Sequence, residues 1–146
     1  MQFDTQVKTA VYRWTVETTK PPTVVEMSEV VGAPARDVRE SYRRLRASRV
    51  LFLEPDGETI RMAPPFSGVP TQHCVRVGGR EYYANCSWDA LGIPAALQEK
   101  AQVSSRCEQT LEPIRIEVGR EGPEPVPVVA HFAVPAAKWW ADLVYT

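Results

Sequence analysis

The stretch Tyr82-Tyr83-Ala84-Asn85-Cys86-Ser87-Trp88-Asp89-Ala90-Leu91-Gly92-Ile93-Pro94 organises the rest of the chain. It predicts the end of a β-strand that runs directly into a helix. Cys86 then lies at the strand-to-helix junction, and Asp89, three residues later, falls on the same helix face. Backbone N–H groups at a helix N-terminus favour the thiolate, which is both a nucleophile and a ligand for soft metals.

Both residues also have a purely structural interpretation. A cysteine at a strand end is most often a small buried hydrophobe. An aspartate in the first turn of a helix is most often a cap. The spacing of Cys86 and Asp89 alone leaves the chemical and the structural roles open.

A hairpin is predicted immediately before this junction. Two strand-like runs, His73–Val77 and Arg80–Cys86, are separated only by Gly78-Gly79. Two glycines between such runs are typical of a two-residue hairpin turn. We therefore expect Val77 to pair with Arg80, which fixes the register of the whole hairpin.

This register separates the two nearest cysteines. It places His73 opposite Ala84, and the alternation of side chains puts both on the same sheet face as Cys86. Cys74 points to the other face and is a poor partner for Cys86. His73 is the nearest candidate helper, although a histidine beside alanine on a sheet face is more often structural. A register slip of one residue would reverse this assignment.

Three helices are predicted in the N-terminal part. Residues 5 to about 18 carry apolar side chains at helical spacing. Thr23 and Glu26 form a capping box at the start of a second helix, Gly32 ends it, and Pro34 begins the third.

A small hairpin follows the helices. Val50–Leu53 and Thr59–Met62 are strand-like and are joined by the turn residues Pro55-Asp56-Gly57. Three helices followed by a hairpin are typical of a winged helix-turn-helix. We therefore expect residues 1–63 to form a winged-helix-like module and residues 64–146 a second domain, because the proline-rich segment from 63 to 70 is a rigid connector.

The third helix offers a nucleic-acid hypothesis. It carries six arginines: Arg36, Arg39, Arg43, Arg44, Arg46 and Arg49. A basic recognition helix would fit a DNA-binding regulator, with Cys86 as a sensor. Arginines on an exposed helix face are usually a solvated surface, however, and the net charge of −1 gives no global attraction to DNA. Nucleic acid is therefore an unlikely partner.

The second domain continues with short elements. We expect a short helix to Gly92, a restart at Pro94 that runs to about Gln102, and a loop or strand entry at 104–107. The later elements are predicted as strands over 113–118 and 126–134, a short helix over 136–142, and the beginning of a strand at 143–145. The expected class is α+β: the winged-helix-like three-helix module followed by a small, mostly antiparallel sheet with short helices.

The composition of the chain indicates which class of protein to expect. The chain has 146 residues, of which 44% are hydrophobic, and no apolar run approaches the ~18 residues that a membrane span needs. Its beginning lacks the apolar core of a signal peptide, so we expect a cytoplasmic protein without a membrane partner. Three cysteines in such a chain favour free thiols over disulfides. We expect the protein to be either a monomer or a homodimer.

The second half resembles the organomercurial (alkylmercury) lyase family over about residues 64–135. The segments that carry the resemblance are Pro70–His73, Arg76–Arg80, Tyr83–Leu91, Ile93–Leu97 and Ala101–Cys107. The Cys-x-x-Asp-Ala-Leu element between a hairpin and a helix is fairly specific, whereas a bare Cys-x-x-Asp would not be. The family also carries an N-terminal winged helix.

The resemblance implies a carbon–mercury bond cleavage by protonolysis. Cys86 matches the cysteine whose thiolate captures mercury, and Asp89 matches the aspartate that passes a proton to the departing carbon. Both would contact the metal, which arrives as part of the substrate, so no resident cofactor is implied. Mercury(II) is soft and prefers two thiolates. Cys107 matches a cysteine that the family uses structurally, which predicts a buried thiol.

One family feature has no match. The second catalytic cysteine of the family lies in a C-terminal strand, and Cys74, Cys86 and Cys107 do not occupy that place. The chain is then either shortened before that thiol, or a member of a family branch with different chemistry, or dependent on an outside thiol.

Three hypotheses about function follow. The first is a lyase that takes small organomercurials and low-molecular-weight thiols. The second is a module that binds a thiophilic metal or another ligand without cleavage, and the third is the DNA-binding regulator.

Overall fold

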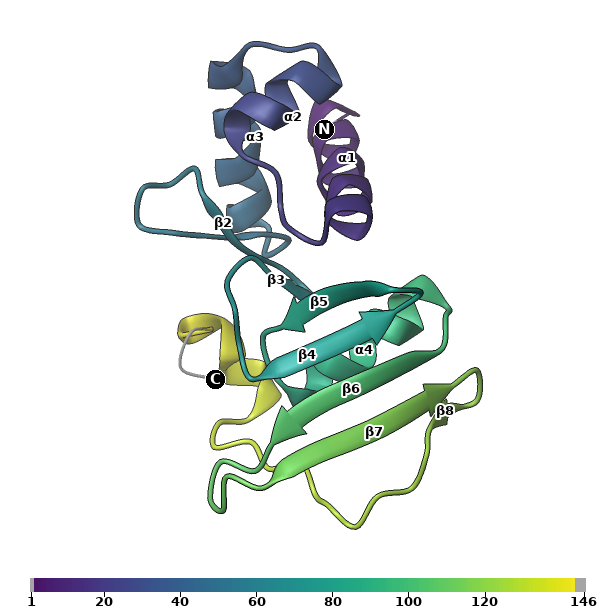
Figure 1. Cartoon of the computed structure of the whole chain (residues 1–146). Helices are drawn as coiled ribbons and strands as arrows, with labels where there is room; N and C mark the ends of the chain where they lie inside the picture. The colour runs from purple at the N-terminus through teal and green to yellow at the C-terminus, as the bar shows by residue number, and fades with distance from the viewer. Residues whose placement is uncertain (1, 144–146) are drawn as a thin grey trace.

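The computed structural model describes residues 2–143 and shows an α+β fold (Figure 1). The helices are α1 (Gln2–Thr18), α2 (Val24–Val31), α3 (Ala35–Ala47), α4 (Ser87–Leu97) and the 3₁₀ helix η1 (Ala136–Ala141). The strands are β1 (Phe52–Leu53), β2 (Ile60–Ala63), β3 (Phe66–Ser67), β4 (His73–Val77), β5 (Arg80–Ala84), β6 (Ala101–Arg106), β7 (Pro113–Gly119) and β8 (Gly122–Pro123). None of the helices within residues 2–143 has the length and hydropathy of a membrane-spanning segment.

The three N-terminal helices form where the sequence predicts them. Thr23 and Glu26 make the expected reciprocal capping box on α2, and Gly32 ends that helix at a φ of 65°. These helices pack on one another around a core that includes Val11, Met27 and Tyr42, all fully buried. The apolar stripes of three short helices are therefore buried in one cluster.

An ion pair connects α1 to α3. The carboxylate of Asp4 accepts hydrogen bonds from Arg44, at 2.8 and 2.9 Å, and from the Ser41 hydroxyl at 2.6 Å. These bonds favour the charged carboxylate, with Arg44 first, and lower the Asp4 pKa to about 2. Arginine on α3 thus serves the packing of this helix against α1.

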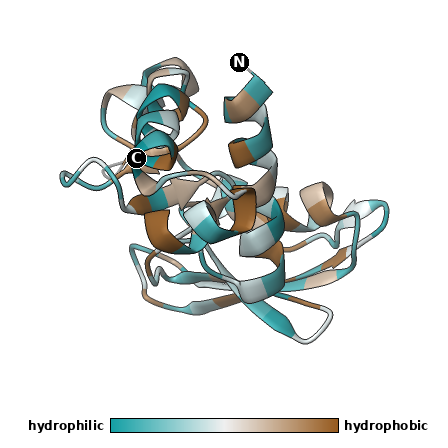
Figure 2. Cartoon of the chain, turned by 90° about the horizontal axis from the view of Figure 1, so that it is seen from above, coloured by the Kyte–Doolittle hydropathy of each residue, from teal (hydrophilic) through white to brown (hydrophobic). Residues whose placement is uncertain are grey.

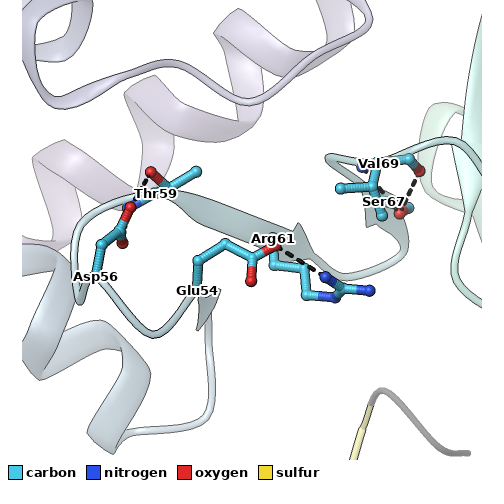
Figure 3. Close-up of polar contacts among 6 residues, drawn as sticks. All are labelled: Glu54, Asp56, Thr59, Arg61, Ser67 and Val69. Carbon is cyan, nitrogen blue, oxygen red and sulfur yellow. Dashed lines mark hydrogen bonds and ion pairs between the residues drawn. The ribbon is translucent and has the colours of Figure 1, made fainter.

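The hairpin of β1 and β2 follows α3 (Figure 3). Asp56 accepts hydrogen bonds from the backbone N–H groups of Glu58 and Thr59 and so holds the turn. The Arg61 guanidinium on β2 donates to Glu54 across the hairpin at 2.9 Å. These contacts hold together a hairpin whose β1 strand is only two residues long.

The strands form one antiparallel sheet in the order β1-β2-β3-β5-β4-β6-β7-β8 among the described residues. β3 pairs with β2 on one side and β5 on the other, so the sheet continues through the predicted connector. The hairpin register is confirmed: Val77 pairs with Arg80 and His73 with Ala84. Both turn glycines have positive φ, 53° for Gly78 and 80° for Gly79, as this turn requires.

The helix α4 covers one face of β4, β5 and β6 (Figure 1). Its buried residues Ala90 and Ile93 pack with Val75, Tyr82 and other apolar side chains of the sheet in a second core cluster. Seen from above, hydrophobic and hydrophilic segments alternate along the helices (Figure 2). Burial of the apolar segments holds α4 on the sheet.

The helix α1 joins the two core clusters. The Tyr82 hydroxyl on β5 donates to the Val16 carbonyl of α1 at 2.6 Å. Tyr12, one turn earlier, packs against both clusters. The N-terminal helices are thus fastened to the strand that leads to Cys86.

Several predicted boundaries are wrong. The helix does not break at Gly92 but continues through Pro94, because burial of both Ile93 and Pro94 holds it against the sheet. It ends at Leu97, and the expected end of the helix is instead the start of β6, whose alternate residues are buried between two strands. Pairing in the sheet has overridden local helix propensity.

The predicted strand over 126–134 is also wrong. This segment has no strand pairing in the structure. Pro125 and Pro127 lack the N–H groups that a ladder needs, which accounts for the difference. The 3₁₀ helix η1 lies close to the predicted helix over 136–142, whereas the expected strand at 143–145 extends beyond the described residues.

We predict that the hairpin turn depends on glycine at position 79. Gly79→Ala should lower the free energy of unfolding by about 1 kcal/mol, because alanine is strained at positive φ. Gly119→Ala is the matched control, because its φ is not positive and its added Cβ would make only an ordinary contact with the Gly122 carbonyl oxygen at 3.8 Å. Urea unfolding measures both. Equal effects of the two substitutions would contradict the role of the turn.

Candidate active site

Cys86 lies between β5 and α4, as predicted. It is the N-cap residue of α4, with an extended backbone, and its carbonyl accepts the first helical hydrogen bond from the Ala90 N–H at 2.9 Å. Its Sγ lies 3.6 Å from Oδ2 of Asp89. The strand-to-helix junction therefore brings the thiol and the carboxyl group into direct contact.

Asp89 is half-buried in the first turn of α4. Burial raises its pKa to about 6, although the hydrogen bond from the Cys86 thiol acts in the opposite direction. Removing a carboxylate from water disfavours its charged form. Asp89 can therefore change its protonation state near neutral pH, which a general acid or base requires.

The Cys86 thiol differs from the sequence expectation. Burial and the nearby Asp89 charge raise its pKa, and the backbone N–H groups of Asp89 and Trp88 only oppose this shift. The helix N-terminus favours the thiolate, as expected, but burial outweighs it. The resting pair is thus a thiol beside a carboxyl group, with a proton that the two can exchange.

Tyr12 and the Pro64–Pro65 segment lie near the helix α4, which carries Asp89. Tyr12 on α1 donates a hydrogen bond to the Pro64 carbonyl at 3.0 Å. Pro65 lies against Gly92, where an added Cβ would sit 3.4 Å from the proline Cβ. No sequence pattern pointed to Tyr12, because it lies 77 positions from Asp89 and carries no motif.

His73 does not act as the helper of Cys86 in this structure. Its Nδ1 and the Ser105 Oγ are 2.8 Å apart, which pairs the histidine with β6. Burial lowers its pKa, so the neutral ring is favoured. The structural interpretation of His73 fits these contacts.

The other two cysteines are also placed. Cys74 pairs with Tyr83 in the sheet, and burial together with Glu81 raises its pKa to about 11. Cys107 was predicted to be buried, and this is wrong: it is half-exposed after β6, where Thr110 lowers its pKa through hydrogen bonds to the sulfur. It follows the last strand residue, so its side chain lies in a turn and not in the core.

The last described residues of the chain lie close to the junction between β5 and α4. The Asn85 side chain donates to the Leu143 carbonyl at 3.4 Å, and Leu143 is buried. Asn85 precedes Cys86, so the chain around residue 143 packs next to the junction.

The site offers few protein ligands to a metal. Within residues 2–143 no group of three or more His, Cys, Asp or Glu side chains is placed to hold an ion. Cys86 and Asp89 supply one sulfur and one carboxylate. This set fits a soft metal that needs only one or two protein ligands, such as one carried by a substrate.

The raised pKa of Asp89 predicts a pH-dependent stability. A carboxyl whose folded pKa exceeds its unfolded value stabilises the fold at low pH and loses this contribution as pH rises from about 4 through 6. Asp89→Asn, which stays neutral, should therefore gain about 1–2 kcal/mol over the wild type between pH 4 and pH 7. Urea unfolding at several pH values measures this gain.

Asp56→Asn is the control for this trend. The pKa of Asp56 is lowered by its hydrogen bonds to Thr59 and Glu58, so its contribution has the opposite sign. This variant should lose stability relative to the wild type as pH rises. A difference between Asp89→Asn and the wild type that does not change with pH would contradict the assignment.

Comparison with known proteins identifies relatives of the site-bearing half. The profile of the alkylmercury lyase (MerB) family matches residues 66–146, more than half of the chain. The alkylmercury lyase of Streptomyces lividans is 30% identical over 125 residues, which cover 81% of this chain and 54% of that protein. The Bacillus cereus alkylmercury lyase is 28% identical over 96 residues, 66% of this chain and 42% of that protein.

A solved structure agrees in fold. The crystal structure of the mercury-bound form of MerB2 aligns with a TM-score of 0.63 and 22% sequence identity, over 85% of this chain and 65% of that one. The chain spans about half the length of the curated relatives it matches. By the match of its residues 66–146, this chain belongs to the alkylmercury lyase family.

Proposed function

We propose that this protein cleaves carbon–mercury bonds by protonolysis, with Cys86 as the mercury ligand and nucleophile and Asp89 as the proton carrier. The supporting observation is the half-buried thiol–carboxyl pair, with 3.6 Å between Cys86 Sγ and Asp89 Oδ2. The family membership of the site-bearing half and the names of its relatives support the same reaction. The mercury is part of the substrate and product, and the proposal needs no resident cofactor.

The first step loads mercury onto sulfur. Asp89 takes the Cys86 proton, and the thiolate attacks the mercury of an R–Hg–SR′ compound. A sulfur–mercury bond forms to Cys86 while the thiolate R′S⁻ leaves. The raised pKa of Asp89 suits this step, because a carboxylate with a pKa near 6 is a better base than an ordinary one.

The second step breaks the carbon–mercury bond. Protonated Asp89 gives its proton to the carbon bound to mercury, RH departs, and R′S⁻ rejoins the metal. The net change is R–Hg–SR′ and the Cys86 thiol giving RH and a Cys86–S–Hg–SR′ adduct. A second small thiol then replaces Cys86 on mercury and returns its proton to the protein.

The second sulfur comes from a low-molecular-weight thiol in this proposal. Cys74 lies on the opposite sheet face from the face that α4 covers, and Cys107 is two strands away from β5 in the sheet order, beyond the end of β6. Trp88, two residues after Cys86, is 66% exposed, and in this proposal the small thiol enters on this side. An exposed indole offers apolar surface to the organic group of the substrate.

The N-terminal residues 1–63 are proposed to be a winged-helix-like module that supports the site without binding DNA. Three of the α3 arginines are engaged by carboxylates: Arg36 by Asp37, Arg39 by Glu58 and Arg44 by Asp4. Such pairs reduce the positive charge available to phosphates. The proposed boundary lies between residues 63 and 64. The cytoplasmic location and the monomeric or homodimeric state stay predictions.

The proposed reaction predicts benzene release from phenylmercury in the presence of excess small thiol. Cys86→Ser and Asp89→Asn should each lower the rate by about 100-fold or more, because each removes a group that acts in the chemical step. Gas chromatography of the headspace measures the benzene. Asp89→Asn should still bind mercury through Cys86.

Cys74→Ser is the matched control and should keep wild-type turnover, because its thiol faces away from the site. Wild-type activity in Cys86→Ser would contradict the assignment of the nucleophile. Stoichiometric mercury binding by the wild type without any benzene would instead identify a binding module.

A further inference from the structure

Tyr12 lies where the N-terminal helices meet the site-bearing layer. It is half-buried on α1 and packs against both hydrophobic clusters, the one between α1, α2 and α3 and the one between α4 and the sheet. Its neighbour Val11 is fully buried in the first cluster alone. Tyr12 therefore contacts both cores with one side chain.

The Tyr12 hydroxyl holds a specific piece of backbone. It donates to the Pro64 carbonyl at 3.0 Å, and the Val50 carbonyl lies 3.5 Å away. The next residue, Pro65, lies against α4 at Gly92, where an added Cβ would be 3.4 Å from the proline Cβ. A continuous path of contacts thus runs from Tyr12 through two prolines to α4.

This path reaches α4 on the face of Asp89. Gly92 comes three residues after Asp89, and residues with this spacing are neighbours on a helix surface. Burial and, second, the charge of Asp89 raise the pKa of Tyr12. Tyr12 and Asp89 are both half-buried.

We propose that Tyr12 is a positioning residue. It holds the Pro64–Pro65 segment against α4, and this keeps the Asp89 carboxyl directed at the mercury-bound carbon. This inference rests on the proposed function. In this proposal Tyr12 does not touch the substrate. Capture of mercury belongs to Cys86, whereas delivery of the proton depends on where the Asp89 carboxyl lies, so a loss of Tyr12 contacts affects the second step.

The test compares Tyr12→Phe with Tyr42→Phe in the full chain. Tyr42 is the matched control, because it also places its hydroxyl near a proline carbonyl, Pro22 at 3.5 Å, but lies in the N-terminal core. Each variant loses one hydroxyl and keeps its ring. Both should unfold at similar urea concentrations.

We expect Tyr12→Phe to change kcat but not KM. With phenylmercury and excess thiol, Tyr12→Phe should lower kcat about ten-fold and leave KM unchanged, because a misplaced catalytic group slows the chemical step. Tyr42→Phe should change neither. A parallel change of kcat and KM in both variants, or an unchanged kcat in Tyr12→Phe, would overturn the inference.

A second readout separates this inference from the proposed function. The ¹³C carboxyl resonance of Asp89, recorded at one fixed pH in the substrate-free protein, should shift in Tyr12→Phe and stay in place in Tyr42→Phe. An unshifted resonance in Tyr12→Phe overturns the positioning role even if the wild type is active. Absence of benzene from the wild type would refute the proposed function, and the resonance would still decide the role of Tyr12.

Discussion

The register of the β4–β5 hairpin is the constraint on which the site depends. Gly78 and Gly79 adopt positive φ, the turn takes two residues, and every cross-strand pair follows from it. At the end of β5 the chain turns into α4, and Cys86 caps the helix. A slip of one residue would turn the alternate side chains to the other face and remove Tyr82 and Ala84 from the core against which α4 packs.

The burial of the thiol and the carboxyl group has opposite consequences for stability and for chemistry. Partial removal from water raises both pKa values, so the charged forms are disfavoured. For Asp89 this means that the fold loses stability as pH rises from about 4 through 6. The same burial gives the pair a proton that it can exchange near neutral pH. Two layers provide this environment: the sheet beneath α4, and the N-terminal helices, which reach it through Tyr12 and the hydrogen bond between Tyr82 and Val16.

Local patterns in the sequence were sufficient for the parts of the fold with local causes. The capping box of Thr23, the end of α2 at Gly32 and the hairpin register all follow from residues close together in the chain, and so does the contact of Cys86 with Asp89. The first residues of β6 are predicted as helix, and this is wrong because sheet pairing overrides their helical tendency. The raised pKa of Cys86 and the place of Tyr12 arise from contacts between distant segments, and Cys107 is half-exposed because the chain turns after Arg106.

The dependence of kcat/KM on pH tests most directly whether Asp89 carries the proton. In this account Asp89 must begin as a carboxylate to accept the Cys86 proton, so kcat/KM for phenylmercury should fall as pH drops below about 6, which is the pKa of Asp89. The raised pKa of the Cys86 thiol keeps that proton available at neutral pH. A kcat/KM that stays constant from pH 5 to pH 8 would contradict the central role of the pair.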